Sequence, residues 1–202
     1  MLKVRIIPCL DIVKNKVVKG VNFKNIKVLG DPVYLARKYS DNGADELCML
    51  DIKASHEKRK TFLKTVEAIA KVIDIPLTVG GGVSDIKDIT TLLNAGADKV
   101  SINTTAVLKP NLIKIASLKH GSQCIVVAID GKRYGKKMLV TIKGGRERTN
   151  KTVVSWAKNV QNLGAGELLV TSMDTDGIQT GFDKEMLIAI NNEVNIPVIA
   201  SG

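Results

Sequence analysis

Short apolar runs alternate along this chain with segments in which apolar residues recur at helical spacing, the pattern of repeated βα units. Strands are predicted at about residues 4–10, 47–51, 76–79, 100–103, 124–130, 168–171 and 197–200. Helices are predicted at about residues 31–43, 57–73, 84–96, 110–119, 152–163 and 183–192. Hairpin-like excursions follow the first and fifth strands, over Val13–Lys19 and Met138–Ile142. The pattern therefore predicts an α/β protein with a mainly parallel sheet.

Two of the helix starts carry a capping signal. Asp31 is expected to be the N-cap of the first helix, because Pro32 follows it at the first helical position. Ser84 is expected to cap the helix that follows a glycine-rich turn.

Two predicted strands, far apart in the sequence, each end in an aspartate. The first is Ile7-Pro8-Cys9-Leu10-Asp11 and the second is Val126-Val127-Ala128-Ile129-Asp130. In a parallel α/β protein, ligands bind at the C-terminal ends of the strands. We therefore expect Asp11 and Asp130 to face each other across one mouth and to act as a paired acid and base. The alternative is that each aspartate only caps the turn after its strand.

An internal repeat relates the two parts of the chain. Gly43-Ala44-Asp45-Glu46-Leu47 recurs as Gly164-Ala165-Gly166-Glu167-Leu168, and the offset from Gly43 to Gly164 is 121 positions. Asp74-Ile75-Pro76 recurs as Asn195-Ile196-Pro197 at the same offset. Two such halves, about 1–120 and 121–202, predict a single (β/α)8 TIM-barrel domain.

The second half is shorter than the first. After its glycine-rich turn the first half continues through a helix, a fourth strand and a fourth helix, whereas the second half stops at Ser201-Gly202. The barrel is therefore expected to be incomplete, with about seven strands and without its last βα portion. We expect a fragment, an interrupted gene or one half of a split pair, and an inactive barrel that at most binds a partner is the corresponding alternative.

Composition limits the classes of function. No run approaches the ~18 apolar residues of a membrane span, and the N-terminus enters a strand at once, so a cytoplasmic protein without a membrane segment is expected. The net charge is +10 but aromatic residues make up only 3%, which leaves no stacking platform for nucleic acid. The lysines are interpreted as a solvated surface, or alternatively as a positive field that attracts an anionic substrate.

The cysteines and histidines show no metal-ligand spacing. Cys9, Cys48 and Cys124 lie in or beside apolar runs and are expected to be reduced, buried thiols. His56 and His120 are expected at the surface. Neither a metal nor a cofactor is expected.

Glycine-rich turns suggest anion binding. Gly80-Gly81-Gly82 precedes a helix N-terminus, where backbone N–H groups can approach a phosphate closely, and Asn103-Thr104 adds side-chain donors. The repeat places a second site at Asp176-Gly177 and Ser201-Gly202. Tight turns without a ligand are the alternative.

Charged residues open several of the predicted strands. They are Arg5, Glu46, Lys99 and Glu167. Two cations and two anions at this end of a barrel can form a ring of ion pairs that shields the barrel bottom.

Motifs along all 202 residues resemble one known family. They are Pro8-Cys9-Leu10-Asp11, Val17-Val18-Lys19-Gly20, Asn22-Phe23, Gly30-Asp31-Pro32, Asp45-Glu46-Leu47, Leu50-Asp51-Ile52, Thr78-Val79-Gly80-Gly81-Gly82, Lys99-Val100-Ser101-Ile102-Asn103-Thr104, Gly121-Ser122-Gln123, Ala128-Ile129-Asp130, Gly164-Ala165-Gly166-Glu167 and Asp176-Gly177. In this order they resemble the cyclase subunit of imidazole glycerol phosphate synthase, a lyase of histidine biosynthesis.

The resemblance implies an activity and a partner. The family's cyclase takes ammonia from a glutaminase subunit, with which it forms a heterodimer. It converts a bisphosphorylated aminoimidazole carboxamide ribonucleotide to imidazole glycerol phosphate and an aminoimidazole carboxamide ribotide. The ring of Arg5, Glu46, Lys99 and Glu167 would be the ammonia gate, with Asp98 and Gln123 at the partner interface.

The resemblance also implies site residues. Asp11 and Asp130 match the catalytic pair, although the sequence leaves open which of them is the acid. Lys19 lies on a loop that closes over substrate, and Asp51 supports substrate binding at the same mouth. The first phosphate site would use Gly81, Gly82, Asn103 and Thr104, and the second Asp176, Gly177, Ser201 and Gly202.

Some positions depart from the family pattern. Val21 and Lys53 stand where the family usually has threonine, and Thr175-Asp176-Gly177-Ile178 replaces Arg-Asp-Gly-Thr. The missing hydroxyl at Ile178 is expected to weaken phosphate binding. The sister isomerase of the same pathway, which shares the repeat and two aspartates, is a further alternative, but Lys19 and the charged ring argue against it.

Overall fold

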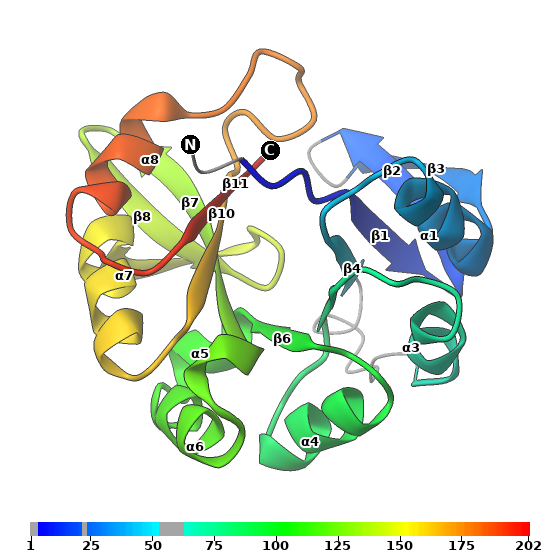
Figure 1. The fold of residues 1–202 in the computed structure, drawn as a ribbon. Coiled ribbons are helices and arrows are strands. Elements are labelled where there is room, and N and C mark those ends of the chain that lie inside the picture. The colour runs from blue at the N-terminus through cyan, green and yellow to red at the C-terminus, as the bar shows by residue number, and fades with distance from the viewer. Residues whose placement is uncertain (1–3, 22–23, 53–62) are drawn as a thin grey trace. The chain divides into compact units, whose positions relative to one another are not determined.

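A computed structural model describes the backbone of residues 4–21, 24–52 and 63–202. Asn22-Phe23, Lys53 and His56 lie outside the described residues. The chain divides into two compact units, which are described one at a time (Figure 1). The first contains Met1–Lys19 and Ile26–Val100, and the second contains Gly20–Asn25 and Ser101–Gly202.

The strands of the first unit run in the order β5-β4-β1-β2-β3. Their bounds are β1 (Cys9–Val13), β2 (Lys16–Val21), β3 (Lys24–Gly30), β4 (Leu47–Asp51) and β5 (Leu77–Gly80). β4 pairs in parallel with β1 and β5, whereas β2 returns antiparallel to β1 after a turn at Lys14 and Asn15, which both have positive φ. The helices are α1 (Pro32–Asp41), α3 (Leu63–Ala70) and α4 (Ile86–Asn94).

The capping signals decide where two of these helices begin. The Asp31 carboxylate accepts hydrogen bonds from the backbone N–H groups of Val33 and Tyr34, so the predicted start of α1 is confirmed. The prediction for α4 is wrong by one residue, because Asp85 is its N-cap. Ser84 lies outside the helix, where its hydroxyl donates to the Asp88 carboxylate at 2.6 Å.

In the second unit β7 lies beside β10, and β10 beside β11. The strands are β7 (Ile125–Tyr134), β8 (Lys137–Ile142), β9 (Glu147–Thr152), β10 (Glu167–Ser172) and β11 (Val198–Ser201). The helices are α5 (Thr104–Leu108), α6 (Asn111–His120), the 3₁₀ turn η1 (Ser122–Cys124), α7 (Val153–Asn162) and α8 (Lys184–Asn191). β10 is parallel to β7 and β11, and β7, β8 and β9 form an antiparallel meander. The passage between the units falls within β6 (Lys99–Ile102).

The two units repeat one strand register. Asp11 on β1 lies opposite Leu50 on β4, and Asp130 on β7 lies opposite Thr171 on β10. Leu50 and Thr171 are themselves related by the repeat offset. The β4–β5 and β10–β11 pairings also match position by position. The internal repeat seen in the sequence is therefore a repeat of strand pairing.

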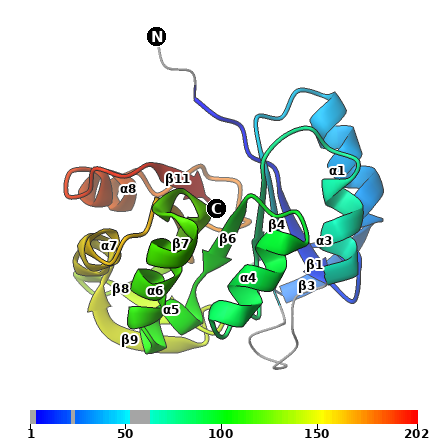
Figure 2. The same cartoon turned by 60° about the horizontal axis from the view of Figure 1, so that its bottom comes forward.

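Apolar side chains fill both units. Nearly every side chain of β5, β10 and the first part of β7 is buried, the pattern of parallel strands covered on both faces. Figure 2 shows α4 of the first unit and α6 of the second lying along their strands. The largest fully buried side chains include Trp156 of α7, Leu47 of β4 and Ile129 of β7. The α/β class is confirmed, and strands and helices follow one another as in an incomplete (β/α)8 TIM barrel.

Several elements differ from the sequence prediction. β3, β9 and α5 are not predicted: β9 has an entirely polar sequence, β3 has only three apolar side chains among seven residues, and α5 is a short helix of five residues. The first strand begins at Cys9, and Val4 and Ile6 are exposed. The Ile6 and Pro8 carbonyls accept hydrogen bonds from the backbone N–H groups of Asp45 and Cys48, ahead of the regular part of the strand.

The expectation of three buried thiols is wrong for Cys9. Cys48 is buried and Cys124 half-buried, but Cys9 is exposed. β2 pairs only with Asp11 to Val13, so Cys9 lies before the paired part of β1 on that side. All three cysteines are free thiols in the structure.

Candidate active site

Asp130 is a half-buried carboxylate on β7 of the second unit. The Asn103 side-chain amide donates a hydrogen bond to Asp130 Oδ2 at 2.9 Å. Burial raises the pKa of Asp130 to about 6, the Asn103 hydrogen bond opposes this, and the negative charge of Asp176 adds to it. Near neutral pH the carboxyl can therefore hold a proton and release it, which is the property a general acid needs.

Asp11 occupies the equivalent position on β1 of the first unit. It lies opposite Val18 on the antiparallel neighbour β2, just as Asp130 lies opposite Thr141 on β8. Each aspartate thus stands where its strand leaves the parallel sheet and enters a hairpin. The expectation that the strands end at these residues is wrong, because hairpin pairing carries both strands further. That the two aspartates face each other stays a prediction.

Two further residues of the first unit were predicted at the mouth. Lys19 is exposed on β2, directly after the partner of Asp11. Asp51 is buried at the end of β4, opposite Ile12 of β1.

The glycine-rich turn after β5 touches Asp51 directly. Gly81 has φ +95°, and a Cβ built on it would lie 2.7 Å from the Asp51 backbone nitrogen and 2.8 Å from its Cα. Gly82 also has positive φ. Only glycine fits at position 81, because its backbone packs directly against the backbone of Asp51.

The second unit brings its predicted phosphate residues together. The Asp176 backbone N–H donates to the Ser172 carbonyl at 2.9 Å, and Gly177 follows with φ +76°. A Cβ on Gly202 would lie 3.7 Å from the Cα of Asp176. Ser201, Thr171 and Asp130 lie side by side on β11, β10 and β7. Thr171 is not among the site residues predicted from the sequence. It lies opposite Asp130 just as Leu50, its counterpart in the repeat, lies opposite Asp11.

Asn103 and Thr104 both contact other parts of the second unit. The Thr104 hydroxyl accepts a hydrogen bond from the Lys143 backbone N–H at 2.9 Å, at the turn after β8. Asn103 precedes α5 but does not cap it, since its amide is bonded to Asp130. The buried Asn103 Oδ1 accepts no hydrogen bond from the part of the chain that the structure describes. Asn103 therefore links the predicted phosphate residues to the predicted catalytic carboxyl.

Three of the four predicted gate residues meet in the first unit. The Glu46 carboxylate, with a side chain only 8% exposed, forms ion pairs with Arg5 and with Lys99, the latter at 2.9 Å. Glu167 is buried at the start of β10 in the second unit. Each of the four charged residues thus lies at or before the N-terminal end of a strand, whereas Asp11 and Asp130 lie further along their strands.

The two predicted interface residues are exposed. Asp98 accepts a hydrogen bond from the Leu77 backbone N–H at 2.8 Å, so its carboxylate also fixes the start of β5. Gln123 lies in η1 of the second unit.

The profile of the family described as "Histidine biosynthesis protein" matches residues 5–202. The chain belongs to this family. Curated relatives named "Imidazole glycerol phosphate synthase subunit HisF" include those of Prochlorococcus marinus strain MIT 9312, at 55% identity, and of strain MIT 9215, at 54%. A third, from subspecies pastoris strain CCMP1986, is 55% identical. Each alignment covers 100% of this chain and 80% of the relative.

The family assignment confirms the resemblance that the motifs indicated. The relatives are named as subunits, so their enzyme contains another polypeptide. In the described part of this chain no helix combines the length and apolarity needed to cross a bilayer.

Proposed function

We propose that this chain is the cyclase subunit of imidazole glycerol phosphate synthase, a lyase of histidine biosynthesis. Identity of 55% over the whole chain supports the family reaction. The single structural observation that carries the proposal is the equal register of Asp11 and Asp130 in two repeated units. A repeat that presents one carboxyl from each unit suits a reaction with two proton-transfer roles.

The reaction needs protons to move in both directions. Ammonia adds to a carbonyl carbon, water leaves, and a C–N bond breaks to release the aminoimidazole carboxamide ribotide. Asp130, with its pKa near 6, is suited to donate the proton that the leaving water takes. Asp11 then accepts a proton from the added ammonia nitrogen.

The bisphosphorylated substrate requires two anion-binding ends. Gly81 and Gly82, ahead of the N-terminus of α4, are suited to one phosphate, with Asn103 and Thr104 as side-chain donors. Asp176-Gly177 and Ser201-Gly202 are suited to the other. Lys19 and Asp51 would then contact the part of the substrate that joins its two phosphates.

We further propose that ammonia arrives from a glutaminase subunit bound in a heterodimer. Arg5, Glu46, Lys99 and Glu167 would form the gate, and Asp98 and Gln123 would contact the partner. The carboxylate of Glu46 bridges two cations, so a gate can open by exchanging one ion pair without leaving a buried charge alone. A cytoplasmic location follows from this pathway.

The test is ring closure by the purified chain with an ammonium salt as nitrogen source. We expect Asp11→Asn and Asp130→Asn each to lower kcat by at least about a hundredfold with little change in KM. Asp41→Asn, an exposed carboxylate in α1, is the control and should leave both unchanged.

Two outcomes would contradict the proposal. One is full activity of either aspartate variant. The other is a wild-type chain that melts cooperatively yet gives no turnover, which favours an inactive barrel that at most binds a partner.

A further inference from the structure

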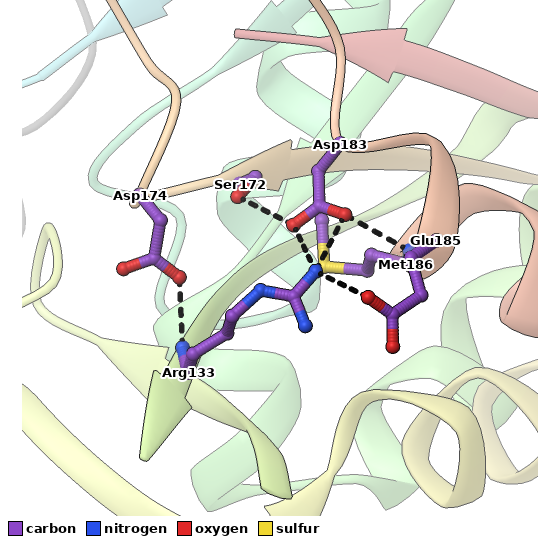
Figure 3. Close-up of polar contacts among 6 residues, drawn as sticks. All are labelled: Arg133, Ser172, Asp174, Asp183, Glu185 and Met186. Atoms are coloured by element: carbon purple, nitrogen blue, oxygen red, sulfur yellow. Dashed lines mark hydrogen bonds and ion pairs between the residues drawn. The ribbon is translucent and has the colours of Figure 1, made fainter. Parts of the chain in front are cut away.

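Arg133 holds both ends of the loop between β10 and α8, residues 173–183 (Figure 3). Its backbone N–H donates to Asp174 Oδ2 at 2.8 Å, at the start of the loop. Its guanidinium Nη2 donates to both carboxylate oxygens of Asp183, at 2.9 and 3.1 Å, at the end of the loop. The same nitrogen lies 3.1 Å from Glu185 Oε2.

Asp183 is where three elements meet. Its side chain is only 7% exposed, and it accepts hydrogen bonds from Ser172 Oγ at 3.2 Å and from the Met186 backbone N–H at 3.1 Å. One carboxylate therefore joins β7, β10 and the N-terminus of α8. Charge-assisted bonds to a buried carboxylate are among the stronger polar contacts in proteins.

The middle of the loop has few apolar contacts. Ile178 is 43% exposed and Phe182 52% exposed, and a Cβ on Gly181 would meet no heavy atom within 4 Å. Packing therefore contributes little to the path of residues 178–182, and the polar contacts at the ends of the loop contribute correspondingly more.

The strand that carries Asp130 reaches the loop at a third point. The Gly131 carbonyl accepts a hydrogen bond from the Met173 backbone N–H at 2.8 Å. A Cβ on Gly131 would lie 3.0 Å from Val153 and closer still to the Met186 sulfur, so β7 and the first turn of α8 are in direct contact. Residues 130–133 of β7 thus contact both Asn103, a predicted phosphate-binding residue, and the loop.

We propose that Arg133 is a positioning residue that fixes the loop carrying Asp176 and Gly177 at a set distance from Asp130. This rests on the proposed function, in which the loop binds one phosphate and Asp130 transfers protons. Arg133 acts on Asp176 and Gly177 through the two ends of the loop, by bonding Asp174 with its backbone N–H and Asp183 with its guanidinium. Of these bonds, only the one to Asp183 depends on the arginine side chain.

The contacts of Arg133 with Asp174 and Asp183, called the clamp below, have a second consequence for Asp130. Asp176 is the charged neighbour that raises the pKa of Asp130, and Asn103 is its neutral hydrogen-bond donor. Burial is the main cause of the raised pKa of Asp130 and the Asp176 charge adds to it, so movement of the loop away from Asp130 lowers that pKa by a small amount.

The experiment compares Arg133→Met, Arg133→Lys and Lys158→Met in the full chain. Lys158 forms an exposed ion pair with Glu193 at 2.7 Å in the same unit and serves as the matched control. Amide hydrogen exchange of residues 173–182 reports the loop, and KM, kcat and the pH midpoint of kcat are measured with free ammonia held constant at every pH.

We expect Arg133→Met to raise exchange in the loop and KM about tenfold each and to move the pH midpoint below about 6. Arg133→Lys, which keeps the charge but not the bidentate geometry, should lie in between. Lys158→Met should change none of these values.

The proposal is overturned if Arg133→Met folds, keeps wild-type exchange in residues 173–182 and keeps KM. Because exchange requires no substrate, this result is independent of turnover. A wild-type chain without turnover would refute the proposed function alone, and the exchange data would still decide whether the clamp exists.

Discussion

At the scale of single residues, the surroundings of Asp130 matter more than its residue type. The chain has many carboxylates, but Asp130 combines burial, a single amide donor and a like charge nearby. Burial and the like charge of Asp176 raise its pKa to about 6 against the opposing effect of the Asn103 hydrogen bond. The folded protein is destabilised when this poorly solvated carboxyl is ionised.

This predicts that Asp130→Asn stabilises the fold at neutral pH. A carboxyl whose pKa is raised from 3.8 to about 6 binds more protons in the folded state, so stability falls as pH rises through that window. Asparagine keeps an acceptor for Asn103 but has no charge to bury. We expect a gain on the order of 3 kcal/mol at pH 7.5 and almost none at pH 4, measured by urea unfolding.

Asp41→Asn is the control, because its side chain is 66% exposed. An equal change for Asp130→Asn at both pH values would contradict the burial argument.

At the scale of elements, turns after parallel strands determine how close two backbones come. Gly81 follows β5 and contacts the backbone of Asp51 at the end of β4. Gly43 follows α1 with a similar φ of +82°, but a Cβ there would meet nothing within 4 Å. An alanine at position 43 would therefore meet only the strain of a left-handed backbone, whereas an alanine at position 81 would also overlap the Asp51 backbone.

Gly81→Ala is therefore expected to destabilise the chain by more than about 3 kcal/mol. Gly43→Ala should cost about 1 kcal/mol, since only the left-handed conformation is strained. Chemical denaturation of both variants measures the difference. Equal losses would mean that the β5 turn relaxes and does not need glycine for close approach.

At the scale of the whole molecule, the proposed gate residues lie at the starts of strands, and the proposed catalytic residues Asp11 and Asp130 lie further along their strands. Glu46 bridges Arg5 and Lys99 within the first unit. Either these pairs only shield buried polar groups, or they control the passage of ammonia.

Lys99→Ala distinguishes these alternatives. If Lys99 is part of the gate, the reaction with glutamine and the glutaminase partner should fall several-fold more than the reaction with free ammonium. Lys64→Ala, at an exposed position on α3, is the control. Equal losses in both assays would remove the gate and leave a structural role.

The sequence by itself determined the α/β class, the repeat and most elements. Local chemistry sufficed for α1, where Asp31 and Pro32 mark the start, and for the hairpin between β1 and β2. It also placed Asp11 and Asp130 at equivalent positions, because an apolar run precedes each and their separation of 119 positions differs from the repeat offset of 121 by only a small gap.

Only the tertiary structure decided which polar groups meet. β9 has an entirely polar sequence and is a strand because the backbone of β8 pairs with it. The bonds from Asn103 to Asp130 and from Arg133 to Asp183 join residues 27 and 50 positions apart. Local propensity carries no information about such contacts. The first lowers the proton affinity of Asp130, which burial in the fold raises, and the second ties β7 to the end of the loop before α8.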